Sequence, residues 1–574
     1  MAGSRRQKGQ SMKKTEGKPL PLGVTIQEDK INFAFPVPEG KKGSLLLYHA
    51  GESRPCSSYA LEDTVGEVRY LALEGCDPTE YEYNLEVDGE IVPDTYAKAF
   101  AGCKTWGKEK NFKEHEVRCR MAEEPYDWEG DLPLHIPYHD VIAYALHVRG
   151  FTKDSSSKVK HKGTFQGVVE KIQYMQELGI NQIQCMPIYE FDECGYRTNY
   201  WGYGEAYYFA PKSSYYCDGD GVKGLKDMVK ACHKAGIEVV LEMPFAAGIS
   251  GQMAGECLRY YMMEYHIDGF ILNPLNVSIE SISADPILKK TKILKHQEGF
   301  QNVMRRFLKG DEGMIGPVMH WLRHLSGEDH IYNYITTHTG FTLKDLVSYD
   351  GKHNEKNGEN NQDGPDYNFS WNCGAEGNSR KKTVLELRKT QMRNAFFLLL
   401  LSQGTPCILA GDEFANSQKG NNNVYCQDNP IGWLNWGNLE RERELHDFVK
   451  SLIALRKSCP ALRPEKEMLG MDRIGCGVPD VSYHGESAWQ APVEVSSRNL
   501  GVYYSGAQAE CDECFAAYNM HWLAHSLALP ALAKGKKWYL AASTRDGILD
   551  TPVLLEDQRK VEAPPRTIMF IIGE

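Results

Sequence analysis

The first part of the chain is a succession of short hydrophobic runs separated by turn residues. The runs are rich in β-branched and aromatic residues, a pattern typical of strands that bury one face. Asp88-Gly89 directly follows the last run and favours a tight hairpin turn. The pattern predicts a small β-sandwich over residues 19–120, after a polar and disordered tail over residues 1–18. The expected strands cover residues 24–27, 31–35, 44–49, 68–73 and 81–87.

In the middle of the chain, buried strands alternate with amphipathic helices. This repeat predicts an α/β fold, a (β/α)8 TIM barrel over residues 134–460, whose site lies at the carboxyl ends of the strands. A return to short strands predicts a C-terminal β-sandwich over residues 465–574. The expected barrel strands cover residues 141–148, 181–188, 237–243, 267–272, 292–294, 331–338 and 406–413. The expected helices cover residues 165–178, 223–234, 255–265, 383–402 and 439–455.

Charge and hydropathy exclude several classes of protein. The net charge of −12 argues against nucleic acid as a partner, because such surfaces gather phosphates with Lys and Arg. The longest apolar stretch, residues 395–401, is shorter than the roughly 18 residues that a membrane span needs. The basic N-terminus lacks the apolar run of a secretory signal. We therefore expect a cytoplasmic protein without a membrane partner.

Sixteen cysteines in a chain of this kind are expected to be reduced and mostly buried. Cys511 and Cys514 form the one close pair, a spacing that occurs in metal and redox sites. The sequence near this pair contains neither a second cysteine pair nor a Cys-His motif. The sequence therefore predicts no metal and no cofactor.

Several long motifs at the predicted strand ends carry a family resemblance. Together they resemble the glycogen-debranching enzymes and isoamylases of the α-amylase superfamily, glycoside hydrolase family thirteen. The resemblance implies an α-1,6-glucosidase that acts on glycogen or limit dextrins with retention, and an N-terminal sandwich similar to a glycogen-binding module. That sandwich contains a single Trp, Trp106. The motifs are YALHVRGFT (144–152), TNYWGY (198–203), HTGFTLKDLVSYDGKHNEKNGENNQDG (338–364), FSWNCGAEG (369–377), LLLLSQGTPCILAGDEF (398–414) and GNNNVYCQDNPIGWLNW (420–436).

The positions that the family uses for catalysis hold other residues in this chain. By the resemblance, Asn273 stands at the position of the nucleophile, Lys295 at that of the general acid and Thr339 at that of the third acid. Glu298 is an alternative for the general acid. Retaining chemistry needs two carboxyl groups, so intact catalytic residues are not expected. Where relatives carry an Asn that bears on calcium, this chain has Ala246.

The residues for holding sugar are present. Trp201 and Tyr203 can stack on a glucose face and His338 can bond its hydroxyls; alternatively, the three support the barrel mouth. The interpretation is a non-catalytic homologue that binds α-glucan, either glycogen or maltooligosaccharide, or pairs with an active debranching enzyme. The alternatives are an active α-1,6-glucosidase with relocated carboxylates and an interaction protein without a glucan role. The candidate relocated acids are Glu242, Asp268, Glu280, Asp285 and Glu298.

Overall fold

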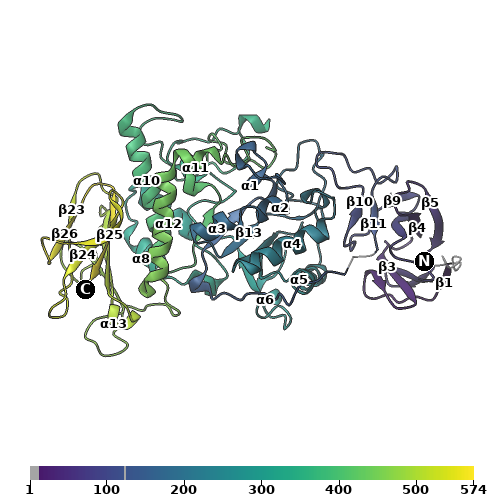
Figure 1. Cartoon of the computed structure of the whole chain (residues 1–574), viewed down its shortest axis with the longest axis horizontal. Coiled ribbons are helices and arrows are strands. Elements are labelled where there is room, and N and C mark those ends of the chain that lie inside the picture. The colour runs from purple at the N-terminus through teal and green to yellow at the C-terminus, as the bar shows by residue number, and fades with distance from the viewer. Residues whose placement is uncertain (1–11, 122–124) are drawn as a thin grey trace, which may run out of the picture.

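The computed structural model describes residues 12–121 and 125–574, which form three parts along one long axis (Figure 1). N-terminal sheets lie at one end, a helix-covered parallel sheet lies in the middle, and C-terminal sheets lie at the other end. β1 (Lys13–Thr15) pairs with β7 (Val68–Glu74). The disordered tail predicted for residues 1–18 is therefore too long, because residues 13–15 form a strand, and residues 1–11 lie outside the described part.

Two antiparallel sheets make up the N-terminal part. The remaining strands are β2 (Gly23–Ile26), β3 (Lys30–Pro36), β4 (Gly43–His49), β5 (Pro55–Ala60), β6 (Asp63–Val65), β8 (Tyr81–Val87), β9 (Glu90–Val92), β10 (Phe100–Ala101) and β11 (Arg118–Arg120). One sheet has the order β1-β7-β3-β2 and the other β10-β11-β8-β4-β5. Their apolar faces meet in a core that includes Phe33 and Leu45. The Asp88-Gly89 turn joins β8 to β9 with positive φ at both residues, as a tight hairpin requires.

A curved parallel sheet forms the centre of the molecule. Its strands are β12 (Ala143–Leu146), β13 (Gln182–Cys185), β16 (Glu238–Met243), β17 (Gly269–Leu272), β18 (Lys292–Lys295) and β19 (Cys407–Leu409). They have the order β18-β17-β16-β13-β12-β19. Residues 330–335 lie between the two edge strands: Lys295 N–H bonds the His330 carbonyl, and Cys407 N–H bonds the Asn333 carbonyl. This segment closes the sheet into a barrel.

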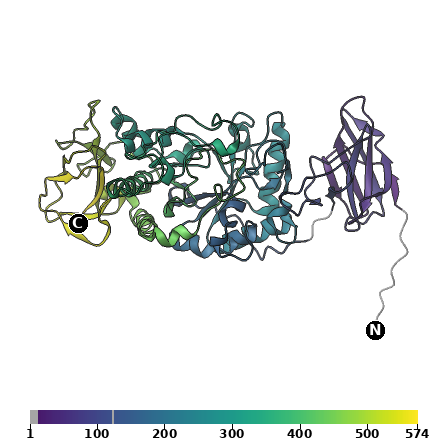
Figure 2. The ribbon, with the colours of Figure 1, turned by 90° about the horizontal axis from the view of Figure 1, so that it is seen from above.

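Helices surround the barrel (Figure 2). They are α1 (Val148–Thr152), α2 (Phe165–Val169), α3 (Ile172–Leu178), α4 (Gly221–Lys234), α5 (Gly251–Tyr265), α6 (Ile279–Ser283), α7 (Gly299–Lys309), α8 (Ile315–Arg323), α9 (Leu343–Leu346), α10 (Lys382–Leu400), α11 (Gly437–Arg441) and α12 (Arg443–Ser458). Side chains cap several of them, since Thr164, Asp220 and Ser250 each accept a backbone N–H at the start of α2, α4 and α5. The prediction of one continuous helix over residues 165–178 is wrong, because the structure has two helices there, α2 and α3.

The C-terminal part is a largely antiparallel β structure packed against α10 and α12 (Figure 1). Its elements are β20 (Val481–His484), β21 (Asn499–Tyr504), α13 (Gly506–Ala509), β22 (Glu513–Asn519), β23 (His525–Ala528), β24 (Trp538–Ser543), β25 (Gly547–Leu554), β26 (Lys560–Ala563) and β27 (Thr567–Gly573). The main sheet has the order β20-β21-β22-β27-β24-β25, and β23 pairs with β26. Buried residues of the barrel helices and of this sheet share one apolar cluster, so the two parts are joined by a continuous core.

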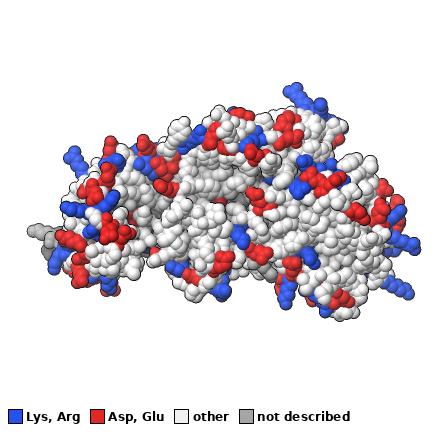
Figure 3. All heavy atoms as spheres, turned by 180° about the vertical axis from the view of Figure 1, so that it is seen from behind, with Lys and Arg blue, Asp and Glu red and all other residues white. Residues whose placement is uncertain are grey.

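Acidic and basic side chains are interspersed on the face seen in Figure 3. Between them, a broad area over the middle of the molecule consists of uncharged residues. The distribution of charge therefore does not mark a functional site on this face.

Candidate functional site

A pocket opens at the carboxyl ends of the barrel strands. Its wall includes Glu242 from β16, Lys295 from β18 and His338, which follows the closing segment. A second pocket shares Ala145, Met186 and His338 with the first, so the two form one hollow at the barrel mouth. This end of a parallel barrel is the one that carries functional sites in barrel proteins generally.

Glu242 and His338 line this hollow and form a compact hydrogen-bonded group with Tyr203, which lies beside the described lining. The Tyr203 hydroxyl donates to Glu242 Oε1 at 2.6 Å and lies 2.7 Å from His338 Nε2. Because the single hydroxyl proton goes to the carboxylate, His338 Nε2 must carry the proton of the second bond. The order of donors is therefore His338 to Tyr203 to Glu242.

The pKa values of the group follow from its burial and its contacts. Burial alone would raise the pKa of Glu242, but the neighbouring His338 and His296 and the Tyr203 hydroxyl lower it to about 2. Burial lowers the pKa of His338 to about 4 despite the nearby carboxylate. At neutral pH the group therefore consists of an ionised Glu242 and a neutral His338.

His296 is the fourth member of the group, and it was not among the residues predicted from the sequence. Its Nε2 lies 3.5 Å from Glu242 Oε1, and its side chain is 42% exposed. Glu242, His296 and His338 offer ligand atoms within 4.8 Å of one another, a set that could hold a divalent ion. However, Tyr203 already bonds Glu242 Oε1 and His338 Nε2. A hydrogen-bonded network therefore fits these residues better than a metal site.

The three positions that the resemblance gives to catalysis differ in whether they line the pockets. Lys295 ends β18 and lines the first pocket, whereas the described lining of both pockets contains neither Asn273 nor Thr339. Asn273 follows β17, and its Oδ1 accepts a turn bond from Leu275 N at 3.0 Å. The exposed Thr339 lies 3.1 Å from the Thr337 hydroxyl. Asn273 and Thr339 therefore make local bonds.

The candidate sugar-holding residues also differ from one another. Trp201 lines the second pocket but is only 4% exposed, and its ring meets His338 edge-on at a centroid distance of 5.0 Å. This burial favours a supporting role for Trp201. Tyr203 and His338 are both half-buried, but only His338 is among the described residues that line the hollow. Stacking on sugar by Trp201 or Tyr203 and bonding by His338 stay predictions.

Trp106, the single Trp of the predicted N-terminal sandwich, lies against the barrel. Its Nε1 donates to Asp428 Oδ2 at 2.8 Å, its ring stacks on Tyr215, and the Arg149 guanidinium lies over it. Its position at this contact explains why the sandwich does not present this ring as a platform for sugar.

The other candidate carboxylates lie outside the hollow. Asp268 precedes β17 at the opposite end of the barrel, where Val239 N and His233 bond it. Asp285 bonds Arg259, and Glu280 bonds Ser278 at the start of α6. Glu298 is exposed before α7. Among the described residues that line the two pockets, Glu242 is the only carboxylate.

The position that bears on calcium in relatives does not offer oxygen ligands. Ala246 carries a methyl group, and its backbone N–H donates to the Tyr208 hydroxyl. The neighbouring carbonyls of Pro244 and Phe245 accept from Asn276 Nδ2. Calcium needs six to eight oxygen ligands, so these residues do not fit it.

Comparisons with known proteins identify the family. The family model described as "Alpha amylase, catalytic domain" matches residues 146–246 of this chain. Isoamylase 3, chloroplastic, from Oryza sativa subsp. japonica is 30% identical over 612 residues, which cover 83% of this chain and 77% of the rice protein. The chain belongs to the isoamylase and GlgX-type group of the α-amylase family. Another similar member, the glycogen operon protein GlgX homolog of Haemophilus influenzae, is 30% identical over 519 residues, covering 70% of this chain and 78% of that protein.

Solved structures confirm the (β/α)8 barrel class of this α-amylase family member. The pullulanase type I of Bacillus subtilis, complexed with maltose, matches with a TM-score of 0.72 at 18% identity, covering 96% of this chain and 85% of that one. The pullulanase of Group B Streptococcus, complexed with maltotetraose, matches with a TM-score of 0.75 at 16% identity, covering 96% and 88%. In the described residues, no helix has both the length and the apolar character needed to cross a membrane.

Proposed function

We propose that this chain is a non-catalytic isoamylase-type protein that binds α-glucan at the barrel mouth. The observation that carries the proposal is that Glu242 is the one carboxylate in the described lining of the hollow. A retaining glycosidase needs two carboxyl groups about 5–5.5 Å apart, one to attack the sugar and one to protonate the leaving oxygen. A single carboxylate held by Tyr203 cannot fill both roles.

The proposal of glucan binding rests on the shape and chemistry of the same hollow. Sugar sites combine flat apolar area with polar groups that bond hydroxyls. The half-buried Tyr203 and His338 supply a ring and a bonding group, and Lys295 supplies a further donor in the wall. The similar pullulanase structures were solved with maltose or maltotetraose bound, so α-glucans are the ligands to test first.

A second candidate is weak hydrolysis by residues that replace the family's own. Glu242 is ionised at neutral pH, and the exposed His296 lies 3.5 Å from it, so a carboxylate and an imidazole stand side by side in the hollow. Such a pair has the elements of general acid–base catalysis. The described lining of the hollow has no second carboxylate near Glu242. We therefore rank weak hydrolysis below non-catalytic glucan binding as the proposed function.

A hydrolysis assay separates the two candidates. Purified protein incubated with glycogen, pullulan or limit dextrin should release no reducing sugar above a blank, because loss of a nucleophile costs on the order of 10⁶ in turnover. Activity of about one turnover per minute would overturn the non-catalytic proposal. Loss of that activity in Glu242→Gln, with Glu298→Gln unchanged, would favour the second candidate.

A binding assay tests the glucan role directly. Glycogen in an affinity gel should retard the protein, and Tyr203→Ala should weaken binding by about 1–3 kcal/mol, the scale of one buried aromatic contact. Tyr367→Ala is the matched control, because Tyr367 is 84% exposed and is not bonded to Glu242 or His338 as Tyr203 is. Equal migration of all three proteins with and without glycogen would exclude binding at this site. Pairing with an active debranching enzyme would then be tested by co-purification from the source cells.

A further inference from the structure

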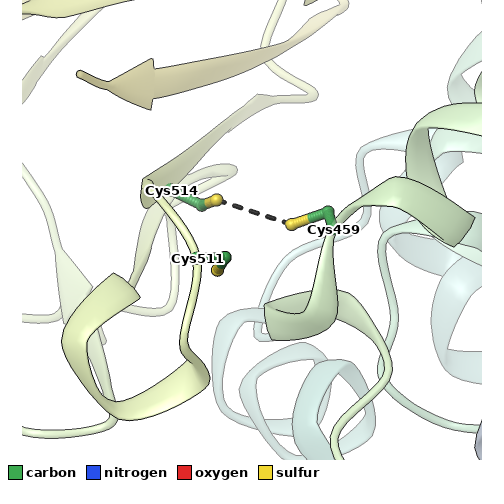
Figure 4. Close-up of side chains that lie close together, drawn as sticks. All are labelled: Cys459, Cys511 and Cys514. Atoms are coloured by element: carbon green, nitrogen blue, oxygen red, sulfur yellow. Dashed lines mark hydrogen bonds between the residues drawn. The ribbon is translucent and has the colours of Figure 1, made fainter.

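Three cysteines meet where the barrel joins the C-terminal sheet (Figure 4). Cys459 lies between α12 and the short 3-10 helix η7 (Pro460–Leu462), whereas Cys511 and Cys514 flank the start of β22. The Sγ atoms of Cys459 and Cys514 point toward one another and are 3.5 Å apart, and all three sulfurs lie within 4.8 Å of one another. The chain brings Cys459 to the close pair from more than fifty residues away.

The segment before β22 holds two of the three sulfurs together. The thiols of Cys511 and Cys514 both donate to the Asp512 carbonyl, each at 3.3 Å. A metal ion would replace the protons of these thiols.

The cluster is closed on two sides and open on the third. Cys459 is 7% exposed and Cys514 is 2% exposed, whereas Cys511 is half-buried. An ion can therefore reach the three sulfurs from solvent past Cys511.

The spacing of the sulfurs matches a metal better than a disulfide. A disulfide needs sulfurs about 2.05 Å apart, so the 3.5 Å pair would have to move closer by more than an ångström. Four ligands around Zn²⁺ with bonds of about 2.3 Å place neighbouring sulfurs about 3.8 Å apart. Separations between 3.5 and 4.8 Å bracket that value, so small side-chain rotations suffice.

We propose that Cys459, Cys511 and Cys514 bind one thiophilic ion, Zn²⁺ or Cu⁺, between the end of α12 and the start of β22. Both ions prefer thiolate ligands; Zn²⁺ would complete a tetrahedron with water at the open side, and Cu⁺ would take three sulfurs. Binding displaces the protons of the neutral thiols to solvent, so affinity rises with pH. The ion would link the barrel to the C-terminal sheet. This metal-binding proposal is independent of the proposed glucan binding.

Metal content and titration test the site. Reduced full-length protein should retain about one ion per chain, and the stripped protein should take up one Zn²⁺ or Cu⁺ with a rise in melting temperature. Chelator-buffered competition between the two ions identifies which one binds more tightly. Co²⁺ should give a thiolate-to-cobalt charge-transfer band, a readout that requires sulfur ligands.

Cysteine variants decide whether these three residues hold the ion. Cys511→Ser should weaken Zn²⁺ binding by at least about tenfold and abolish the charge-transfer band, and its half-buried position should let it fold. Cys476→Ser is the matched control, because Cys476 is exposed in the same part of the chain and outside the cluster. Unchanged binding in Cys511→Ser, or reduced protein that takes up neither ion, would overturn the proposal. So would a disulfide within the cluster, mapped by mass spectrometry, that persists in mild reductant.

Discussion

The Tyr203 hydroxyl lies 2.6 Å from Glu242 Oε1, the one carboxylate among the described residues that line the barrel mouth. The same hydroxyl accepts from His338, so three residues that are far apart in the sequence form one connected group. Burial would make an isolated carboxylate costly, and these donors keep it ionised. We therefore expect Tyr203 to contribute to the stability of the fold.

Removing the Tyr203 hydroxyl should therefore destabilise the fold. In Tyr203→Phe, Glu242 loses a donor while remaining buried, which should cost about 1.5–3 kcal/mol in the free energy of unfolding, measured in urea. Tyr189→Phe is the control, because the buried Tyr189 hydroxyl has no hydrogen-bond partner among the described residues. Its loss should be neutral or slightly stabilising. Equal losses in both variants would mean that the Tyr203 bond contributes nothing specific.

The buried neutral His338 should make stability depend on pH. Its pKa is about 4 in the folded protein, against 6.5 as the ordinary value. Between these values the unfolded chain binds the proton and the folded chain does not, so stability is full above about pH 6.5 and falls toward pH 4. The contribution of His338 to this fall is about 3 kcal/mol.

A variant isolates this contribution from other groups. Burial lowers the pKa of His147 to about 3 and raises that of Asp412 to about 7, so these residues act in the same window with opposite signs. His338→Gln keeps an N–H donor for Tyr203 but cannot titrate. Urea unfolding from pH 4.5 to 7 should give a shallower slope for His338→Gln than for the unchanged protein. Parallel slopes would show that His338 titrates normally.

Most of the fold follows from periodicity, and the exceptions have local causes. The helix predicted over residues 383–402 is α10, whose second half is a continuous buried run over residues 394–400. Residues 331–338 were predicted as a strand but form an irregular segment. The Arg305 guanidinium bonds the Ile335 carbonyl at 2.7 Å, which takes that carbonyl out of the strand ladder. A side chain from α7 that replaces a strand partner leaves no signal in hydrophobic periodicity.

The candidate sites were harder to predict, because they depend on three-dimensional proximity. His296 lies one residue beyond β18 and has no periodic pattern around it, yet it reaches Glu242. In the sequence, the Cys511–Cys514 pair alone does not predict a metal site, because no second pair and no Cys-His motif lies near it. Its third member, Cys459, comes from the end of a barrel helix. Motif spacing finds ligands on one segment but misses those that packing brings from another.

Restoring the nucleophile alone should not restore hydrolysis. Asn273→Asp keeps the oxygen that accepts from Leu275 N, so the free energy of unfolding should change by no more than about 0.5 kcal/mol. A reducing-sugar assay should still give no signal, since Lys295 and Thr339, at the positions that the resemblance gives to the other acids, carry no carboxyl group. Turnover in this single variant would mean that another residue supplies the acid and that only the amide at 273 prevents activity.

A buried cluster of four charged side chains joins the N-terminal part to the barrel. Lys212 Nζ bonds Glu193 Oε2 at 3.0 Å and Glu190 Oε1 at 3.2 Å, with none of its side chain exposed. Lys110, from the segment that follows β10, contacts the same two carboxylates. Two ammonium groups thus balance two carboxylates away from water, and such a set is stable only while every charge has a partner.

Lys212→Met should lower the free energy of unfolding by about 3–5 kcal/mol, because it leaves two buried carboxylates facing one ammonium. Lys108→Met is the matched control, since Lys108 pairs with Glu116 at 2.9 Å on the surface with 58% of its side chain exposed. An exposed pair contributes at most about 1 kcal/mol, and salt screens it further. Chemical unfolding of both variants at low and high salt measures the difference. A Lys212→Met loss as small as that of Lys108→Met would mean that water reaches the cluster and that the carboxylates are solvated without their partner.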